Sequence, residues 1–248
     1  KAIDYSSSKS EKRYISPGVS NFDKINYQLK GCKITHELSD AIALKCPEGV
    51  QIQGAFEDEV YQIMDMDANV QINADDVWAL GYTGTGLAIA VLDTGIDTDN
   101  VELVDSIANG KGFGYATYED DNGHGTHVSG IITANGVDAK AKGVAPDTKV
   151  WMAKVCNSQG SCYVSDIAAA IEYVVKGADG IANNGDEPAK IMSISLGGGG
   201  TASSNCDRDY LASKVNWAVS NGVTVVAAAG NTARRVSSPA CASKAIAV

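Results

Sequence analysis

A continuous apolar run at residues 87–92 constrains the fold most strongly. Its six residues predict a strand buried on both faces, which is typical of a parallel sheet covered by helices. Further strands are expected at 150–155, 191–196, 223–229 and 245–248, alternating with helices at 72–78, 164–175 and 210–220. This alternation predicts a doubly wound, mostly parallel α/β sheet, whose functional residues gather where strands end.

Residues 1–61 have a different pattern and predict a small α+β module. Residues 1–10 are polar and are expected to lack regular structure. The expected elements are a strand at 12–16, a helix at 22–29 between its cap Asn21 and Gly31, a hairpin about Ser39 and extended chain near 61. A module of this size cannot build a strong core alone, so a disulfide would help to stabilise it.

Charge limits the classes of partner. The chain has 30 acidic and 20 basic residues, a net charge of -10, which argues against nucleic acid or an anionic membrane surface as a partner. Apolar runs are too short for a membrane span, so no membrane association is expected. The sequence does not open with a secretory signal pattern, so we expect any signal peptide to have been removed or left out.

The cysteines indicate the redox compartment. Six of them fall into three local pairs, Cys32 with Cys46, Cys156 with Cys162, and Cys206 with Cys241. No CxxC spacing occurs, so neither zinc binding nor redox catalysis is expected. Paired cysteines favour an oxidising compartment, whereas free buried thiols in a cytosolic protein are the alternative.

A glycine-flanked histidine is the first candidate for chemistry. His124 stands between Gly123 and Gly125, and Val128, Ile131 and Ile132 then predict the buried face of a helix. His124 would therefore lie at a helix N-terminus on the rim of the core, where an imidazole can act as a base. Taken alone, such a histidine is as readily structural as catalytic.

Two polar residues follow predicted strands. Asp93 follows the apolar run, and a buried carboxylate needs a partner; a histidine donating its Nδ1–H would provide one and keep Nε2 free as a base. The alternative is that Asp93 caps its Asp-Thr-Gly turn. Asn231, after Ala-Ala-Gly, offers an amide donor for an oxyanion, or is a left-handed turn residue.

The segment 195–200, Ser-Leu-Gly-Gly-Gly-Gly, leaves a predicted strand with bare backbone. Such a segment is suited to pairing with an extended peptide by strand addition. The alternative is a flexible loop.

Together these blocks resemble the subtilisin-like serine proteases. Asp-Thr-Gly-Ile-Asp at 93–97, His-Gly-Thr-His-Val-Ser-Gly at 124–130, Ser-Leu-Gly-Gly at 195–198 and Ala-Ala-Gly-Asn at 228–231 stand in that family's order. The resemblance extends from residue 62 onward. It implies that Asp93 orients His124, that His124 is the general base, and that Asn231 donates to the oxyanion.

The resemblance also implies a substrate cleft. Ser195, Leu196 and Gly197 would form one wall; Gly160 and Ser161, stiffened by the Cys156–Cys162 bridge, would form the other. Val164 and Leu196 suggest an apolar pocket. The pair Cys206 and Cys241 resembles one found in secreted bacterial members of the family, which agrees with a secreted protein.

The resemblance also implies a role for residues 1–61. They would be a ferredoxin-like propeptide that assists folding and inhibits the enzyme, with residues 56–61 as a tail in the cleft. The cut would fall between Tyr61 and Gln62, so that residues 62–248 belong to the catalytic domain. The alternative is a separate binding module without an inhibitory role.

The chain departs from the family at the nucleophile. The family's serine lies in a Gly-Thr-Ser-Met-Ala block well beyond Asn231, and none of the serines at 203, 204, 237 and 238 stands in such a block. We therefore expect the nucleophile beyond Val248, in a part of the protein that is a second chain or was omitted.

A second departure concerns metal. The family's calcium loop would fall at residues 135–142, where two lysines, together with Ile63 at the matching N-terminal position, weaken the site. Calcium is thus a possible structural ion at Glu102 and Asp138, which are otherwise solvated surface acids, and the chemistry needs no cofactor. The acids Asp97, Asp99, Asp120 and Asp121 are expected to be surface charge.

Two functions compete. The favoured one is a serine endopeptidase zymogen that cuts polypeptides through an acyl-enzyme intermediate. The other is a catalytically dead subtilisin-like binding protein. Retention of Asp93, His124 and Asn231 together favours the enzyme, because a dead copy has no physical need for all three.

Overall fold

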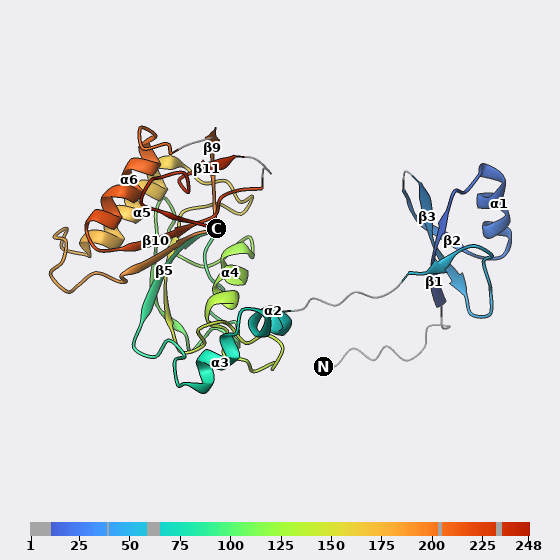
Figure 1. Ribbon diagram of the computed structural model, residues 1–248, viewed down its shortest axis with the longest axis horizontal. Helices are drawn as coiled ribbons and strands as arrows, with labels where there is room; N and C mark the ends of the chain where they lie inside the picture. The colour runs from blue at the N-terminus through green and yellow to red at the C-terminus, as the bar shows by residue number, and fades with distance from the viewer. Residues whose placement is uncertain (1–10, 39, 59–64, 203–204, 232–234) are drawn as a thin grey trace. The chain divides into compact units, whose positions relative to one another are not determined.

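The computed structural model describes residues 11–38, 40–58, 65–202, 205–231 and 235–248 (Figure 1). The chain divides into two compact units, residues 1–63 and residues 64–248. Within the described residues, every helix is too short or too polar to span a bilayer.

The first unit is a four-stranded antiparallel sheet with one helix among its described residues. Its elements are β1 (Glu11–Pro17), α1 (Asn21–Leu29), β2 (Lys33–Glu37), β3 (Ala41–Pro47) and β4 (Phe56–Glu57), and the strand order is β2-β3-β1-β4. A ferredoxin-like β-α-β-β-α-β unit would carry a second helix between β3 and β4. Turns at Gly49 (φ 85°) and Gly54 (φ 79°) take its place here.

The cap of α1 is Ser20, one residue before the expected Asn21. The Ser20 hydroxyl accepts a hydrogen bond from the Asp23 N–H at 3.3 Å, and the Asp23 carboxylate accepts one from the Ser20 N–H at 2.9 Å. This reciprocal capping box satisfies two N–H groups at once, so Asn21 becomes the first helical residue. Gly31, with φ at 82°, follows the helix as expected.

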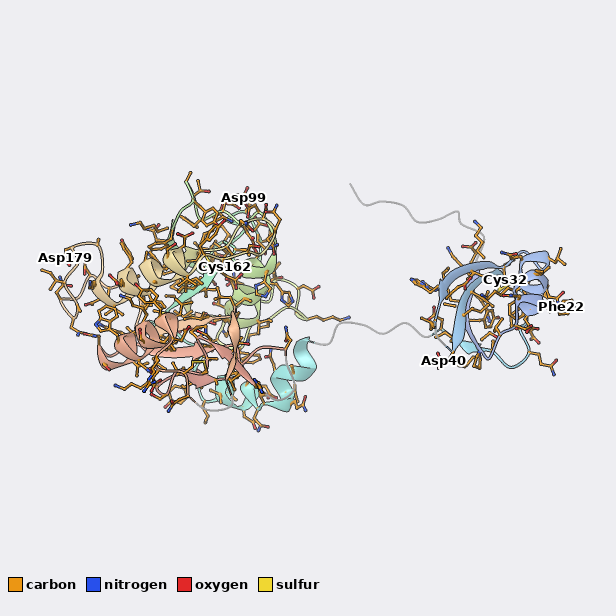
Figure 2. The ribbon with its side chains drawn as sticks, turned by 90° about the horizontal axis from the view of Figure 1, so that it is seen from above. Phe22, Cys32, Asp40, Asp99, Cys162 and Asp179 are labelled. Atoms are coloured by element: carbon orange, nitrogen blue, oxygen red, sulfur yellow. A yellow bond between two sulfur atoms is a disulfide. The ribbon has the colours of Figure 1, made fainter. Side chains whose placement is uncertain are left out.

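The expected hairpin and its disulfide are present. Strands β2 and β3 pair antiparallel, and the Cys32–Cys46 bridge joins them with a Cα–Cα distance of 4.1 Å. Figure 2 shows Cys32 inside this unit and Phe22 at its outer surface, where Phe22 is 71% exposed. The unit is thus held by a small core around Leu44 together with one covalent link.

The second unit has a six-stranded sheet in the order β12-β10-β8-β5-β7-β6, and every adjacent pair is parallel. The prediction of a doubly wound α/β domain is confirmed. The elements of this unit are α2 (Asp65–Gln71), α3 (Ala74–Ala79), β5 (Ala88–Asp93), β6 (Ile107–Gly112), α4 (His124–Thr133), β7 (Lys149–Lys154), α5 (Val164–Lys176), β8 (Ile191–Ile194), β9 (Gly198–Ala202), α6 (Tyr210–Ser220), β10 (Thr224–Ala227), β11 (Val236–Ser238) and β12 (Ile246–Ala247).

Helices cover both faces of this sheet. Helices α5 and α6 bury their apolar faces against one side, and α4 lies on the other (Figure 1). The buried face of α4 is Gly125, Ser129 and Thr133, not the expected Val128, Ile131 and Ile132. Small side chains face the sheet because α4 approaches β5 closely. Val128 and Ile132 are half-buried beside them, and Ile131 is exposed.

Strand β9 corrects a second expectation. Residues from Gly198 onward are not bare backbone, since β9 pairs antiparallel with β11, with Gly198 opposite Ser238. In contrast, Ser195, Leu196 and Gly197 have no backbone hydrogen bond to another described residue. The bare backbone expected at 195–200 is therefore confined to these three residues.

Candidate active site

Asp93 is the last residue of β5 and is only 2% exposed. Its Oδ1 accepts hydrogen bonds from the Thr94 N–H at 2.7 Å and from His124 Nδ1 at 2.8 Å. Its Oδ2 has no partner among the described residues. Burial raises the pKa of this carboxyl above its ordinary value, and the bonds from His124 and Thr94 oppose that shift.

His124 is the first residue of α4, and its ring lies at the surface of the second unit. Gly123 precedes it with φ at 104°, a conformation that other residues rarely adopt, and it starts the helix without a side-chain cap. The side chain is 52% exposed although its partner Asp93 is buried. Because Nδ1 is held by Asp93, Nε2 is left free to accept a proton. Strand and helix thus join two residues that are 31 positions apart.

Asp120 organises the segment that leads into α4. Its carboxylate accepts hydrogen bonds from the Asn122 N–H at 3.0 Å, the Gly123 N–H at 2.9 Å and the Thr126 N–H at 2.9 Å, and from the hydroxyls of Thr94 and Thr126. Partial burial opposes ionisation, but the hydrogen bonds prevail and lower the pKa of Asp120 to about 2. The expectation that Asp120 is mere surface charge was wrong. The sequence signal was its position, four residues before His124.

Lys154 binds the segments that follow β5 and precede α4, from a neighbouring strand of the sheet. It is the last residue of β7, lies opposite Asp93 in the register, and is only 3% exposed. Its ammonium donates to the Thr94 carbonyl and to Asp121 Oδ1. Asp121 is therefore the partner of a buried cation, whereas Asp99 is exposed as expected. Neither Lys154 nor the Thr94 hydroxyl was predicted from the sequence. The Thr94 hydroxyl also accepts a hydrogen bond from the Gly125 N–H at 2.9 Å.

A cavity of about 610 Å³ opens beside this pair. Asp93 and His124 line it together with all five residues predicted for the two substrate walls: Gly160, Ser161, Ser195, Leu196 and Gly197. Val164 lines it as well. The cavity thus places a hydrogen-bonded imidazole next to a backbone segment, Ser195–Gly197, that has unused hydrogen-bonding groups.

The wall at residues 156–162 is a closed loop. The disulfide between Cys156 and Cys162 has a Cα–Cα distance of 4.1 Å, and the Asn157 N–H donates to the Ser161 carbonyl at 2.9 Å. The Asn122 side chain donates to the Ser158 carbonyl at 3.0 Å and so ties this wall to the histidine segment. A third disulfide joins Cys206 to Cys241, with a Cα–Cα distance of 5.4 Å.

Comparison with known proteins settles the family. A model of the subtilase family matches residues 84–248, which is most of the chain. The chain belongs to the subtilase family.

Named relatives agree with this membership. The chain is 37% identical over 181 residues to a major intracellular serine protease of Bacillus subtilis. The alignment covers 68% of this chain and 52% of that protein. It is 33% identical over 209 residues to the minor extracellular protease Vpr of the same organism, covering 77% of this chain and 24% of that protein. It is 36% identical over 156 residues to a subtilisin of Bacillus sp. strain TA39, covering 60% of this chain and 34% of that protein. The chain thus spans about half the length of the first relative and less of the other two.

One predicted site residue of this subtilase is not brought to the cavity. Asn231 follows β10 and Gly230, whose φ is 97°, and its side chain is exposed. It is not among the described residues that line the cavity with His124. The predicted junction at Tyr61 and Gln62 lies outside the described residues.

The described residues near Glu102 do not fit a calcium ion. Its carboxylate accepts hydrogen bonds from the N–H groups of Gly136 at 2.8 Å, Val137 at 2.9 Å and Asp138 at 2.6 Å. The loop turns N–H donors toward the carboxylate, whereas calcium requires oxygen ligands around the ion. Asp138 in turn accepts from the Lys140 N–H at 3.0 Å. Glu102 is thus a structural acid that holds the loop, not one that is merely solvated.

Proposed function

We propose that this subtilase is the front part of a serine endopeptidase that cuts polypeptides through an acyl-enzyme intermediate. The observation that carries the proposal is the 2.8 Å hydrogen bond between Asp93 and His124 in the wall of a cavity that is open to a peptide. Asp93 fixes the ring so that Nε2 takes the proton of an attacking hydroxyl and later returns it to the leaving amine.

The serine that attacks is supplied from outside the described residues. Ser161, Ser195 and Ser238 line the cavity, but none of them is hydrogen-bonded to the His124 ring. We propose that the nucleophile lies in a further part of the protein, on the same or a second chain. Asn231, at the carboxyl end of β10, is proposed to reach the oxyanion once that part is in place.

The first unit is proposed to be an inhibitory propeptide, residues 1–61. Two observations support this role: residues 1–63 are a compact unit of their own, and the last strand described in that unit is the short strand β4. Addition of the isolated residues 1–61 to the mature protease is expected to slow peptide hydrolysis, and mass spectrometry of the mature protein should place its first residue near Gln62.

The protease is proposed to be secreted and to need no metal for its chemistry. Three disulfides support an oxidising compartment. One relative is named as an extracellular protease, although another is named as intracellular. Neither nucleic acid nor membrane is proposed as a partner, since the chain is acidic.

The test uses the complete protease that contains this chain. Wild type is expected to hydrolyse a fluorogenic peptide and to react with a fluorophosphonate, and His124→Ala should lose nearly all of both. His127→Ala is the matched control, because His127 is an exposed histidine three positions further along the same helix. If the complete protein cleaves nothing, the chain is a binding protein instead. If it cleaves the peptide but His124→Ala remains as active as His127→Ala, His124 is not the general base.

A further inference from the structure

One carboxylate in the cleft is not used by the proposed chemistry. Among the described residues that line the cavity, Asp93, His124 and Asp209 are the ionisable ones, because Cys156 and Cys162 form a disulfide. Asp93 and His124 are bonded to each other. Asp209 forms no ion pair with any described residue. The described lining thus holds in Asp209 a carboxylate outside any ion pair or histidine contact, and it holds no lysine or arginine.

Hydrogen bonds from the described residues occupy only one of the two carboxylate oxygens of Asp209. It is the N-cap of α6, where Oδ1 accepts from the Ala212 N–H at 3.0 Å and from the Ser238 hydroxyl. Oδ2 has no partner among the described residues, and it is not one of the buried unpartnered atoms, so it remains open to solvent. The cap bonds hold the carboxylate in place while one oxygen stays available to a ligand.

Four apolar side chains belong to the described lining of the cavity, beside polar ones such as Asn122, Ser161 and Ser195. Val164, Ile167, Leu196 and Leu211 line it together with Asp209. Such walls suit the methylene stem of a long side chain, and the carboxylate suits a cationic head at its end. An apolar side chain would leave Oδ2 facing it without compensation, and an acidic one would be repelled.

We propose that Asp209 is a specificity-determining residue that makes this cleft select a lysine or arginine side chain at one position of the polypeptide substrate. The inference rests on the proposed function, because it assumes that a peptide lies along the cavity. It deepens that function by naming a substrate class, namely basic polypeptides, which a protein of net charge -10 would also attract at long range.

The competing explanation is that Asp209 is only a helix cap. Asp209→Asn separates the two, since asparagine caps helices about as well as aspartate but carries no charge. Asp207→Asn is the matched control. Asp207 is also acidic and hydrogen-bonded, to the Ser243 N–H at 2.8 Å and to Asn216 at 2.7 Å, but it lies outside the described cavity lining.

The experiment compares peptides that differ only in lysine or norleucine, placed in turn at each of the four positions before the cut. In the complete wild-type protease, lysine is expected to raise kcat/KM roughly tenfold over norleucine at one position, as a hydrogen bond to a charged group would. Asp209→Asn should bring that ratio close to one, and Asp207→Asn should keep it. A ratio that Asp209→Asn leaves unchanged, or a wild type without any lysine preference, overturns the proposal.

A second readout does not depend on turnover. The dissociation constants of the same peptides, labelled with fluorescein, are measured by anisotropy on His124→Ala with and without Asp209→Asn. If no peptide is cleaved but lysine peptides bind more tightly and lose that advantage in Asp209→Asn, the proposed function fails and the role of Asp209 stands. Equal binding of lysine and norleucine peptides rejects the role of Asp209, whatever the catalytic result.

Discussion

Gly125 lies so close to Gly95 that a Cβ on Gly125 would stand 2.1 Å from the Gly95 carbonyl oxygen and 3.0 Å from Asp93 Cβ. The first turn of α4 can therefore dock on the end of β5 only with a glycine at this position. The contact sets the spacing between the Asp93 carboxylate and the His124 ring, because Asp93 lies two residues before Gly95 and His124 directly precedes Gly125.

Gly125→Ala is accordingly expected to push α4 away from β5. The clash should cost about 1–3 kcal/mol of unfolding free energy, as overpacking does, and should lower kcat because His124 moves with the helix. Gly130→Ala is the control in the same helix, since a Cβ there meets nothing within 4 Å. It should raise stability by up to about 1 kcal/mol through helix propensity. Thermal unfolding and kcat of both variants check the pair, and equal behaviour would contradict the role of the contact.

Asp93→Asn is expected to lower kcat by about 10⁴-fold, because the amide no longer holds the His124 tautomer that leaves Nε2 free. Stability should change little, since the mutation also removes a buried charge whose Oδ2 lacks a described partner. Peptide hydrolysis and unfolding of the same preparation measure both effects. A loss of less than tenfold in kcat would show that Asp93 does not orient the base.

Asp120 makes stability depend on pH in the acid range. Its pKa is lowered from 3.8 to about 2, so the ionised carboxylate stabilises the folded state above about pH 4, and this contribution disappears as the pH falls toward 2. For a partly exposed group, we expect about 1 kcal/mol after allowing for solvent screening. Asp120→Asn should thus unfold more easily than wild type at pH 6 and equally easily near pH 2. Asp99→Asn, an exposed acid, should match wild type at both values.

The two disulfides of the second unit should differ in their effects. Cys156→Ala with Cys162→Ala opens a loop with a separation of 6 residues and should cost about 2 kcal/mol, while raising KM because a cleft wall loosens. Cys206→Ala with Cys241→Ala opens one of 35 residues and should cost about 4 kcal/mol. Denaturant unfolding and steady-state kinetics separate the two. A larger KM effect from the second pair than from the first would be contrary to this view.

Local pattern was sufficient for much of the fold. The apolar run at 87–92 is strand β5 within one residue, and Tyr210–Ser220 is a helix as expected, since a continuous apolar run and a helical apolar pattern leave few alternatives. Strand β6 was missed because Ile107–Gly112 is rich in polar residues and glycine. It forms because β7 offers it a partner, which no local propensity reports. Strands β9 and β11 were missed for the same reason.

For the site, the sequence by itself determined which side chains could carry the chemistry, a strand-terminal Asp93 and a His124 between two glycines, because strand ends and glycine boundaries are local properties. Only the tertiary structure decided that these two meet at 2.8 Å, that Asp120 and Lys154 hold the corner behind them, and that Asn231 is exposed and outside the cavity lining. The physical reason is that hydrogen bonds between residues far apart in the chain depend on how strands are ordered in the sheet and how closely a helix packs on it. Neither is written in any short stretch of residues.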